Sequence, residues 1–385
     1  MTHILLILIY LAFISLGLPD VLLGAAWPVM YDQFSVPVSY MGIVSLIISG
    51  CTVVSSLLTA RLISRFGTGK VTAASVALTA VGLIGFAFSE EFSRVCLWAV
   101  PYGLGAGCVD AGLNNYVANH YSSRHMSWLH CVWGVGASIG PYVMGWVLTR
   151  GYSWTSGYLY IAAFQVLLTV IFTITITKWK VTTEEVPLSD KSLSLRQVLA
   201  LPGVREAVLI FLCYGAIESI AGHWASSYMY LHMEIPEESA ASLAAIFYLG
   251  ITVGRAVSGF VVSRFHDRQM AYIGMFLVLI GLLLMLVPGV QILCIIGFAI
   301  MGIGCAPIFP CIIHATPLQF GSNRSQSVIG VEMASFYAGT CFLPPAFGVL
   351  ADAIGIGSMP VVLLAFLILM LLLHGRFYRL TGKKN

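Results

Sequence analysis

Long apolar runs, separated by short polar stretches, follow one another along almost the whole chain. A helix needs about 20 mostly apolar residues to cross the hydrocarbon core of a bilayer. Twelve runs approach or exceed this length, and we expect a membrane-spanning helix in each of them: 4–30, 38–62, 71–89, 95–118, 127–149, 155–177, 206–232, 240–263, 270–288, 290–317, 326–351 and 359–375. The pattern predicts an all-α integral membrane protein with twelve transmembrane helices.

Composition narrows the possible function classes. Hydrophobic residues make up 59% of the 385 positions and charged residues only 9%. A water-soluble protein of this size needs far more charge on its surface. The spans leave no room for a sizeable soluble domain, and no H-E-x-x-H or glycine-rich phosphate loop is present. The nine cysteines are scattered without a C-x-x-C pair, so we expect no enzyme, no cofactor and no metal site.

Lysine and arginine are distributed unevenly between the two sides of the predicted membrane. With a cytoplasmic amino terminus, sixteen of the nineteen lie in or beside cytoplasmic segments; Arg94 and Arg150 lie outside, and Arg255 lies within a span. This bias follows the positive-inside rule for one orientation and contradicts the reverse. We therefore expect the cell (inner or plasma) membrane, with both termini cytoplasmic. Because the basic residues lie in short loops, we expect no nucleic-acid partner.

One loop differs from the others, because charge, proline and serine cluster only there. It runs from about Lys178 to Arg205, just short of midway. We interpret it as a cytoplasmic linker, 179–204, between two six-helix bundles, 1–178 and 205–385. The linker is long enough to hold a short amphipathic helix on the membrane surface.

The two predicted bundles share short motifs at nearly constant spacing. "GLPDVLLG" at 17–24 and "GAIESIAG" at 215–222 have the form G-x-x-acid-x-x-x-G and are offset by 198. "ISRF" at 63–66 and "VSRF" at 262–265 are offset by 199, as are "GLG" at Gly103 and "GIG" at Gly302. Parallel repeats of this kind are a recurring architecture of secondary transporters.

Asp20, Asp110 and Glu218 are acids inside the apolar runs of the first, fourth and seventh spans. A charged side chain facing lipid is costly, about 2.5–3.5 kcal/mol for Asp at a helix centre, so each acid should face protein or a water-filled cavity. In the first span Asp20 shares a helical stripe with Gly17, Gly24, Trp27 and Tyr31. In the fourth span Asp110 shares a stripe with small and polar residues: Gly103, Gly107, Asn114 and Ala118.

The third acid, Glu218, shares a face of the seventh span with Tyr214, Gly222 and Ala225. His223 and Trp224 lie off that face in an ideal helix and would join it only if the helix is irregular around Gly222. We include both among the candidate substrate-binding residues on that condition.

Taken together, these features resemble the major facilitator superfamily over essentially the whole chain. The family's turn motif is roughly G-x-x-x-D-R-x-G-R-R, and this chain has "ARLISRFGTGK" at 60–70 and "GFVVSRFHDR" at 259–268. Arg65, Gly67 and Arg264 match motif positions, which implies a gating or structural role. Serine stands where the family aspartate should be, at 64 and 263, which weakens the case for the family's charge latch.

The resemblance implies that helices one, four, seven and ten line a central cavity, and the acid stripes agree with this. A buried carboxyl takes up a proton that a surface carboxyl would not hold, because desolvation disfavours the charged form. Asp110 is our first candidate for proton coupling, Asp20 the second, and Glu218 the third. The other reading is a buried acid that neighbouring helices simply satisfy.

Carboxylates and amides are also good partners for hydroxyl-rich solutes. We therefore expect Asp20, Asn114 and Asn115 to bind substrate, with Glu218 contributing from the seventh span. Trp27 either stacks on the apolar face of a sugar or anchors its helix at the membrane interface.

Four segments narrow the resemblance to the branch of fucose permease-like sugar:proton symporters: "GLGAGCVDAGLNN" (103–115), "WLHCVWGVGASIGP" (128–141), "GRAVSG" (254–259) and "GIGCAPIFP" (302–310). In that branch acids on helices one and four are associated with sugar and proton handling, and they correspond by position to Asp20 and Asp110. The resemblance implies proton-coupled uptake of a neutral, hexose-like sugar by a monomer, through alternating access.

A drug:proton antiporter is the alternative within the same fold. "GASIGPYVMG" (136–145) contains the G-x-x-x-G-P core of a motif typical of such antiporters, although its closing G-G is missing. Acids and aromatic rings also suit cationic drugs. The glycines have a structural reading too, as the packing surface of helix five on helix eight. A channel, a membrane enzyme or a receptor on a transporter scaffold fits less well.

The remaining polar residues within spans have structural readings. Arg255 and Glu332 lie at similar estimated depth in spans eight and eleven, and we predict a mutual ion pair, with gating as the alternative. His130 shares a face with Gly134 and Ala137, so it either packs between helices or faces the cavity.

Overall fold

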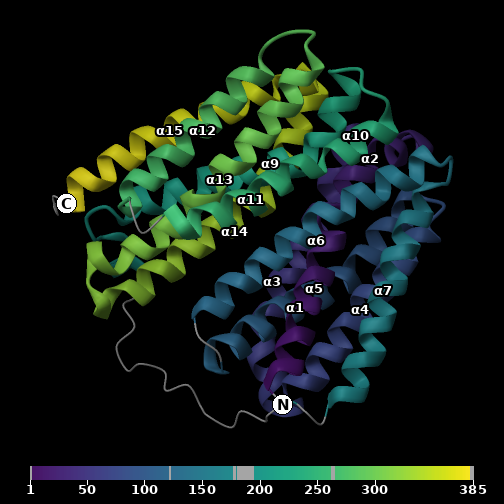
Figure 1. The fold of residues 1–385 in the computed structure, drawn as a ribbon, viewed down its shortest axis with the longest axis horizontal. Helices are drawn as coiled ribbons and strands as arrows, with labels where there is room; N and C mark the ends of the chain where they lie inside the picture. The colour runs from purple at the N-terminus through teal and green to yellow at the C-terminus, as the bar shows by residue number, and fades with distance from the viewer. Residues whose placement is uncertain (1, 121–122, 177–178, 180–194, 262–264, 382–385) are drawn as a thin grey trace. The chain divides into compact units, whose positions relative to one another are not determined.

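The computed structural model describes residues 2–120, 123–176, 179, 195–261 and 265–381 (Figure 1). Within that part of the chain the secondary structure is helical, without strands. Every one of the twelve predicted runs forms a helix or a pair of consecutive helices.

The first six runs correspond to seven α-helices. These are α1 (Thr2–Asp20), α2 (Leu22–Gln33), α3 (Met41–Phe66), α4 (Thr68–Ala87), α5 (Phe92–His120), α6 (Ser123–Thr149) and α7 (Trp154–Thr175). A 3-10 turn, η1 (Val38–Tyr40), precedes α3. The first run differs from its prediction because it is broken at Val21, where φ is −106° and ψ is −1°. Pro19 lies just before the break, and proline both lacks an amide donor and crowds the preceding turn.

The later runs follow the short helix α8 (Leu195–Leu199). They form α9 (Val204–Leu231), α10 (Glu237–Leu243), α11 (Ala245–Val261), α12 (Asp267–Met285), α13 (Gln291–Phe320), α14 (Ser322–Ile354) and α15 (Met359–Thr381), with the 3-10 turn η3 (Ile356–Ser358) before α15. Glycines with positive φ mark several tight turns, among them Gly67 between α3 and α4 and Gly321 between α13 and α14. Only glycine adopts these angles without steric cost.

Eleven helical stretches among the described residues are long and apolar enough to cross a membrane. The broken pair α1–α2 counts as one stretch, Leu5–Gln33, and α10 with most of α11 counts as another, Glu237–Ser258. Helix α9 is 28 residues long but is not among the eleven. The chain is therefore a multi-pass membrane protein with about eleven apolar helices.

The chain divides into two compact units. Unit 1 contains residues 1–185 and 225–245, and unit 2 contains residues 186–224 and 246–385. Helix α9 contributes to both units, its last turns from Ala225 onward belonging to unit 1. Most of the predicted linker 179–204 lies outside the described residues, and the division into two six-helix bundles stays a prediction.

Unit 1 is built around close helix pairs. Figure 1 shows α4, α5 and α7 side by side, and α1 packs along α6. A core of buried apolar side chains joins them, including Phe13 of α1, Val76 of α4 and Phe172 of α7. Trp179, from the start of the predicted linker, also packs in this core beside Gly69.

Candidate functional site

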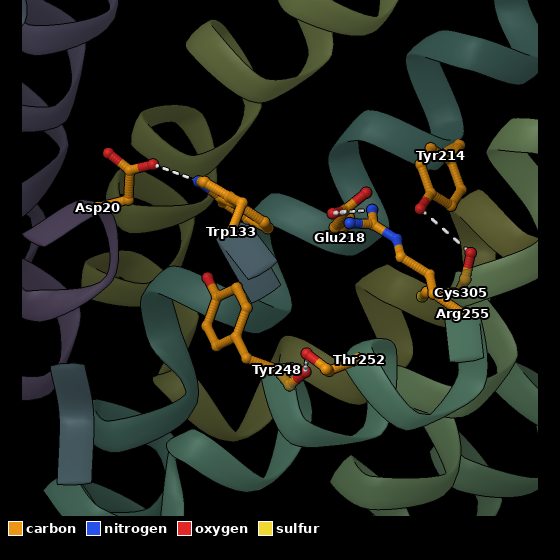
Figure 2. Close-up of polar contacts among 8 residues, drawn as sticks. All are labelled: Asp20, Trp133, Tyr214, Glu218, Tyr248, Thr252, Arg255 and Cys305. Atoms are coloured by element: carbon orange, nitrogen blue, oxygen red, sulfur yellow. Dashed lines mark hydrogen bonds and ion pairs between the residues drawn. The ribbon is translucent and has the colours of Figure 1, made fainter. Parts of the chain in front are cut away.

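Asp20 lies at the break between α1 and α2 and accepts two hydrogen bonds. The Tyr102 hydroxyl of α5 donates to Oδ1 over 3.0 Å. The Trp133 indole N–H of α6 donates to Oδ2 over 2.9 Å (Figure 2). The Asp20 side chain is half-buried. Both carboxyl oxygens therefore have a neutral donor, from two different helices of unit 1.

Small residues allow α1 and α6 to approach closely enough for this contact. A Cβ on Gly17 would clash with the Trp133 carbonyl of α6, and Cβ atoms on Gly136 and Gly140 would clash with the Ile14 and Leu18 carbonyls of α1. Close backbone approach through small residues is typical of membrane helix pairs. These glycines thus bring Trp133 to Asp20. The predicted packing of helix five on helix eight holds at Gly145, which lies against Ser242 of α10.

Asp110, on α5, is paired within its own helix. Asn114, one turn later, donates from Nδ2 to Oδ1 of Asp110 over 2.9 Å and to the Asp110 carbonyl over 3.1 Å. Both side chains are half-buried. The rest of the predicted stripe has another role, because Gly103 and Gly107 pack tightly against Ile48 and Thr52 of α3. Only the Asp110–Asn114 part of the stripe can act as a polar site.

Neither Asp20 nor Asp110 has an ion pair with a cation among the described residues. Asp20 meets a phenol and an indole, and Asp110 meets an amide. Both acids lie within helical stretches that are apolar enough to cross a membrane. A carboxyl in such a place is stable either with several good donors or in its protonated form.

The structure corrects the expectation for Trp27. The Trp27 side chain has no exposed surface, and its indole donates to the Val38 carbonyl over 2.8 Å. Its ring packs edge-on against Phe92. The break at Val21 changes the direction of α2. The predicted stripe assumed one straight helix, so it does not apply to residues after Asp20. Trp27 is a packed anchor and cannot stack on a solute in this structure.

Glu218 of α9 forms an ion pair with Arg255 of α11 inside unit 2. Glu218 Oε1 lies 4.0 Å from Arg255 Nη2, and the two side chains keep 13% and 23% of their surface exposed (Figure 2). One turn before Glu218, the Tyr214 hydroxyl donates to the Cys305 carbonyl of α13 over 3.1 Å.

This ion pair gives Arg255 a partner other than the predicted one. Glu332 of α14 is fully buried, and its recorded hydrogen bonds are with the Thr316 hydroxyl. Estimated depth along a helix gives the height of a side chain but not the direction in which it points. For that reason the similar depth of Arg255 and Glu332 was not enough to predict that the two side chains meet.

His223 and Trp224 lie away from the Glu218 face, because α9 continues through Gly222 as an unbroken α-helix. The His223 ring is bonded to the Ser219 carbonyl at 2.8 Å. Trp224 is fully buried and donates to the Pro344 carbonyl over 3.1 Å, which corrects its expected contact with substrate. The Tyr248 phenol occupies the space that a side chain at 222 would need.

The other predicted residues are dispersed. His130 is exposed and packs edge-on against Phe13 with ring centroids 6.1 Å apart. Arg65 is exposed and lies over the Phe66 ring, and Gly67 forms the turn to α4 with a φ of 83°. Arg264 and the Asn115 side chain lie outside the described residues.

Sequence reasoning missed Tyr102 and Trp133, the two donors to Asp20. A signal existed, since a carboxyl in an apolar helix needs donors from neighbouring helices, and Tyr and Trp carry donors on otherwise apolar side chains. The sequence does not say which of the seventeen Tyr and eight Trp residues supplies them.

Two curated proteins are similar to this chain over most of its length. One is "Bypass of stop codon protein 6" of Saccharomyces cerevisiae, 26% identical over 91% of this chain and 77% of the yeast protein. The other is the "Uncharacterized transporter y4wD" of Sinorhizobium fredii, 25% identical over 85% of each chain.

Solved transporters share the fold at lower identity. The peptide transporter POT matches with a TM-score of 0.80 and 15% identity over 97% of this chain and 95% of its own. The nucleoside transporter NupG matches with a TM-score of 0.77 and 14% identity over 98% and 99%. An inward-facing, unoccupied bacterial homologue of the human lysosomal transporter Spinster gives 0.79 and 11% over 98% and 96%. At these identities the likeness shows the fold alone.

The family model of the Major Facilitator Superfamily matches residues 9–241 and 207–385, which together include nearly the whole chain. This match agrees with the apolar helices, the acids within them and the shared fold. The chain belongs to the Major Facilitator Superfamily and is a multi-pass membrane transporter rather than an enzyme.

Proposed function

We propose that this transporter takes up a neutral, hydroxyl-rich solute of the hexose type together with protons, by alternating access. One observation carries the proposal: Asp20 and Asp110 lie within spans of the same unit and meet neutral donors, with no ion pair to a cation among the described residues. An acid of this kind changes its proton affinity when its hydration changes. Such a change is the physical requirement for coupling solute movement to a proton gradient.

The hydrogen-bond donors of Asp20 and Asp110 differ, and this difference supports different roles for the two acids. Asp20 accepts on both carboxyl oxygens, so its ionised form is well supported. Asp110 accepts a side-chain hydrogen bond on one carboxyl oxygen only. Its donor, the Asn114 amide, also donates to the backbone carbonyl of Asp110. Asp110 is therefore the better proton carrier, and Asp20 the better partner for solute hydroxyl groups.

Trp133 strengthens the case for a sugar. Its indole is half-buried and bonded to Asp20, so an aromatic face and a carboxylate lie next to each other. A sugar presents hydroxyl groups at its edge and an apolar face of C–H groups, and this pair of side chains suits both. Trp133 takes the role that the sequence suggested for Trp27.

Glu218 fits a fixed charge pair better than a proton carrier, because Arg255 supports its ionised form. We further propose that α9, the seventh span along the chain, also crosses the membrane and brings the number of spans to twelve. The family match continues through α9, and the helix is 28 residues long. The charge bias of the loops supports cytoplasmic termini and a location in the cell membrane, and we propose both. A monomeric state is also part of the proposal.

Export of cationic drugs in exchange for protons is the second candidate. Acids without a cationic partner, beside an indole ring, would also hold an organic cation. Proteoliposomes with an imposed pH gradient separate the two functions. Uptake of radiolabelled hexoses that is driven by the gradient and competed by unlabelled hexose supports the symporter. Ethidium movement that is driven by the gradient and insensitive to hexoses would replace it with the antiporter.

A further inference from the structure

Glu332 lies in the interior of unit 2, between α13 and α14. Its side chain has no exposed surface, and the same is true of Thr316 on α13. The Thr316 hydroxyl oxygen lies 3.2 Å from Oε1 and 3.1 Å from Oε2 of Glu332. It also lies 3.0 Å from the Ile312 carbonyl, one turn earlier on α13. One hydroxyl group thus faces three acceptor oxygens.

The two protonation states of Glu332 differ in the hydrogen bonds that they allow. A hydroxyl group donates only one hydrogen bond and accepts others. If Glu332 is ionised, the Thr316 proton must turn toward the carboxylate, which leaves a buried charge with a single shared donor. If Glu332 is protonated, its O–H donates to Thr316, and the Thr316 O–H donates to the Ile312 carbonyl. Every donor has an acceptor in both arrangements, but only the protonated one keeps the Thr316 bond to the Ile312 carbonyl and buries no charge.

No ion pair of Glu332 is present among the described residues. Val328, one turn earlier on α14, is buried in an apolar cluster with Val198 and Val204. Three other acids of this unit have basic partners: Glu218 with Arg255, Glu206 with Arg376 at 2.9 Å, and Asp267 with His314 at 2.8 Å.

Among the described residues of unit 2, the neighbouring helices carry these titratable or charged groups: Arg196 of α8; Arg205, Glu206, Cys213, Tyr214, Glu218 and His223 of α9; Cys294, Cys305, Cys311 and His314 of α13; and Arg324, Tyr337, Cys341 and Asp352 of α14. Among the described residues, the recorded contacts of the Glu332 carboxyl are with Thr316.

We propose that Glu332 is a proton-binding site of unit 2: it carries a proton in this structure and donates it to Thr316, which in turn donates to the Ile312 carbonyl. The site is separate from Asp20 and Asp110 and does not depend on the identity of the solute. A charge would appear between α13 and α14 only if the proton left, so loss of the proton favours separation of the two helices or entry of water.

Infrared difference spectroscopy on the purified full chain at neutral pH tests this directly. The spectrum of the wild type minus that of Glu332→Gln should show the C=O stretching band of a protonated carboxyl group. Glu218→Gln is the matched control, and its difference spectrum should show carboxylate bands instead, because Arg255 supports the ionised form. Carboxylate bands in the Glu332→Gln difference spectrum would overturn the proposal.

Two variants of Thr316 test the hydrogen-bond arrangement. Thr316→Val keeps the shape of the side chain and removes the hydroxyl, so the C=O band assigned to Glu332 should shift or disappear. Thr316→Ser keeps the hydroxyl, and the band should remain near its wild-type position. A band that is unchanged in Thr316→Val would show that Glu332 does not bind its proton against Thr316.

Discussion

The Trp133 indole of α6 donates a hydrogen bond to Asp20 of α1 over 2.9 Å, although 113 residues separate them in the chain. Asp20 lies at a break in a membrane-spanning stretch, and its second donor, Tyr102, comes from a third helix. Three helices of one unit thus meet at one carboxyl group, around which we propose the solute site.

Tryptophan fluorescence should distinguish the two indoles near the first span. We expect a hexose that is transported to change the emission of Trp133 but not that of Trp27, which is fully buried. Trp133→Phe should abolish the solute-dependent change, whereas Trp27→Phe should keep it. Trp133→Phe also removes a donor that holds the Asp20 carboxyl in place, so the Kd of the hexose should rise. A solute signal that is lost in Trp27→Phe and kept in Trp133→Phe would reverse the assignment.

Replacing Asp110 should separate solute binding from proton coupling. Asp110→Asn keeps the shape of the side chain but cannot take up and release a proton. We expect this variant to lose accumulation against a gradient while it retains exchange of labelled for unlabelled solute. Asp352→Asn, at an exposed position of α14, is the control and should accumulate solute normally. Accumulation by Asp110→Asn at the wild-type level would exclude Asp110 as the carrier.

The Arg255–Glu218 pair predicts a non-additive loss of stability. Arg255→Gln leaves the mostly buried Glu218 carboxylate without its cation. Loss of one partner of a fully buried pair costs about 3–5 kcal/mol, and we expect roughly 1–3 kcal/mol here because both side chains keep some exposure. The double variant Glu218→Gln/Arg255→Gln should recover part of that loss in thermal unfolding. Losses that simply add would mean that the two side chains do not interact.

The close packing of α1 on α6 predicts a strong effect of a single methyl group. A Cβ at position 140 would clash with the Leu18 carbonyl, so Gly140→Ala should lower stability by about 1–3 kcal/mol. Gly50→Ala is the matched control because nothing lies within 4 Å of its Cβ position. That variant should be neutral or slightly stabilising, since Ala is the better helix former. Equal melting temperatures for the two variants would contradict the packing described for Gly140.

The positions of the helices could be predicted well from the sequence. A run of apolar residues long enough to span a bilayer leaves helix as the only way to satisfy the backbone of an isolated span. For this reason the predicted segment 71–89 corresponds to α4, Thr68–Ala87, within three residues at each end. The break at Val21 was not predicted, because Pro19 alone does not say whether a membrane helix bends or stops.

The contacts within the site depend on how helices rotate against one another, which a single sequence does not contain. Helical spacing correctly put Asp110 and Asn114 together, because that relationship is local. It failed for Trp27, since the break at Val21 changes the direction of the helix. Estimated depth paired Arg255 with Glu332, whereas Arg255 forms an ion pair with Glu218, because depth does not give the direction in which a side chain points. Tyr102 and Trp133 carry no local mark that distinguishes them from other aromatic residues in spans.

Proton movement that accompanies solute entry tests proton coupling through Asp110 most directly. Hexoses are added to weakly buffered proteoliposomes with no imposed gradient, and the external pH is followed. We predict that a transported hexose makes the external medium more alkaline with wild-type protein, and that the change is absent with Asp110→Asn. Hexose entry without any pH change, or the same alkalinisation with Asp110→Asn, would contradict proton symport through Asp110.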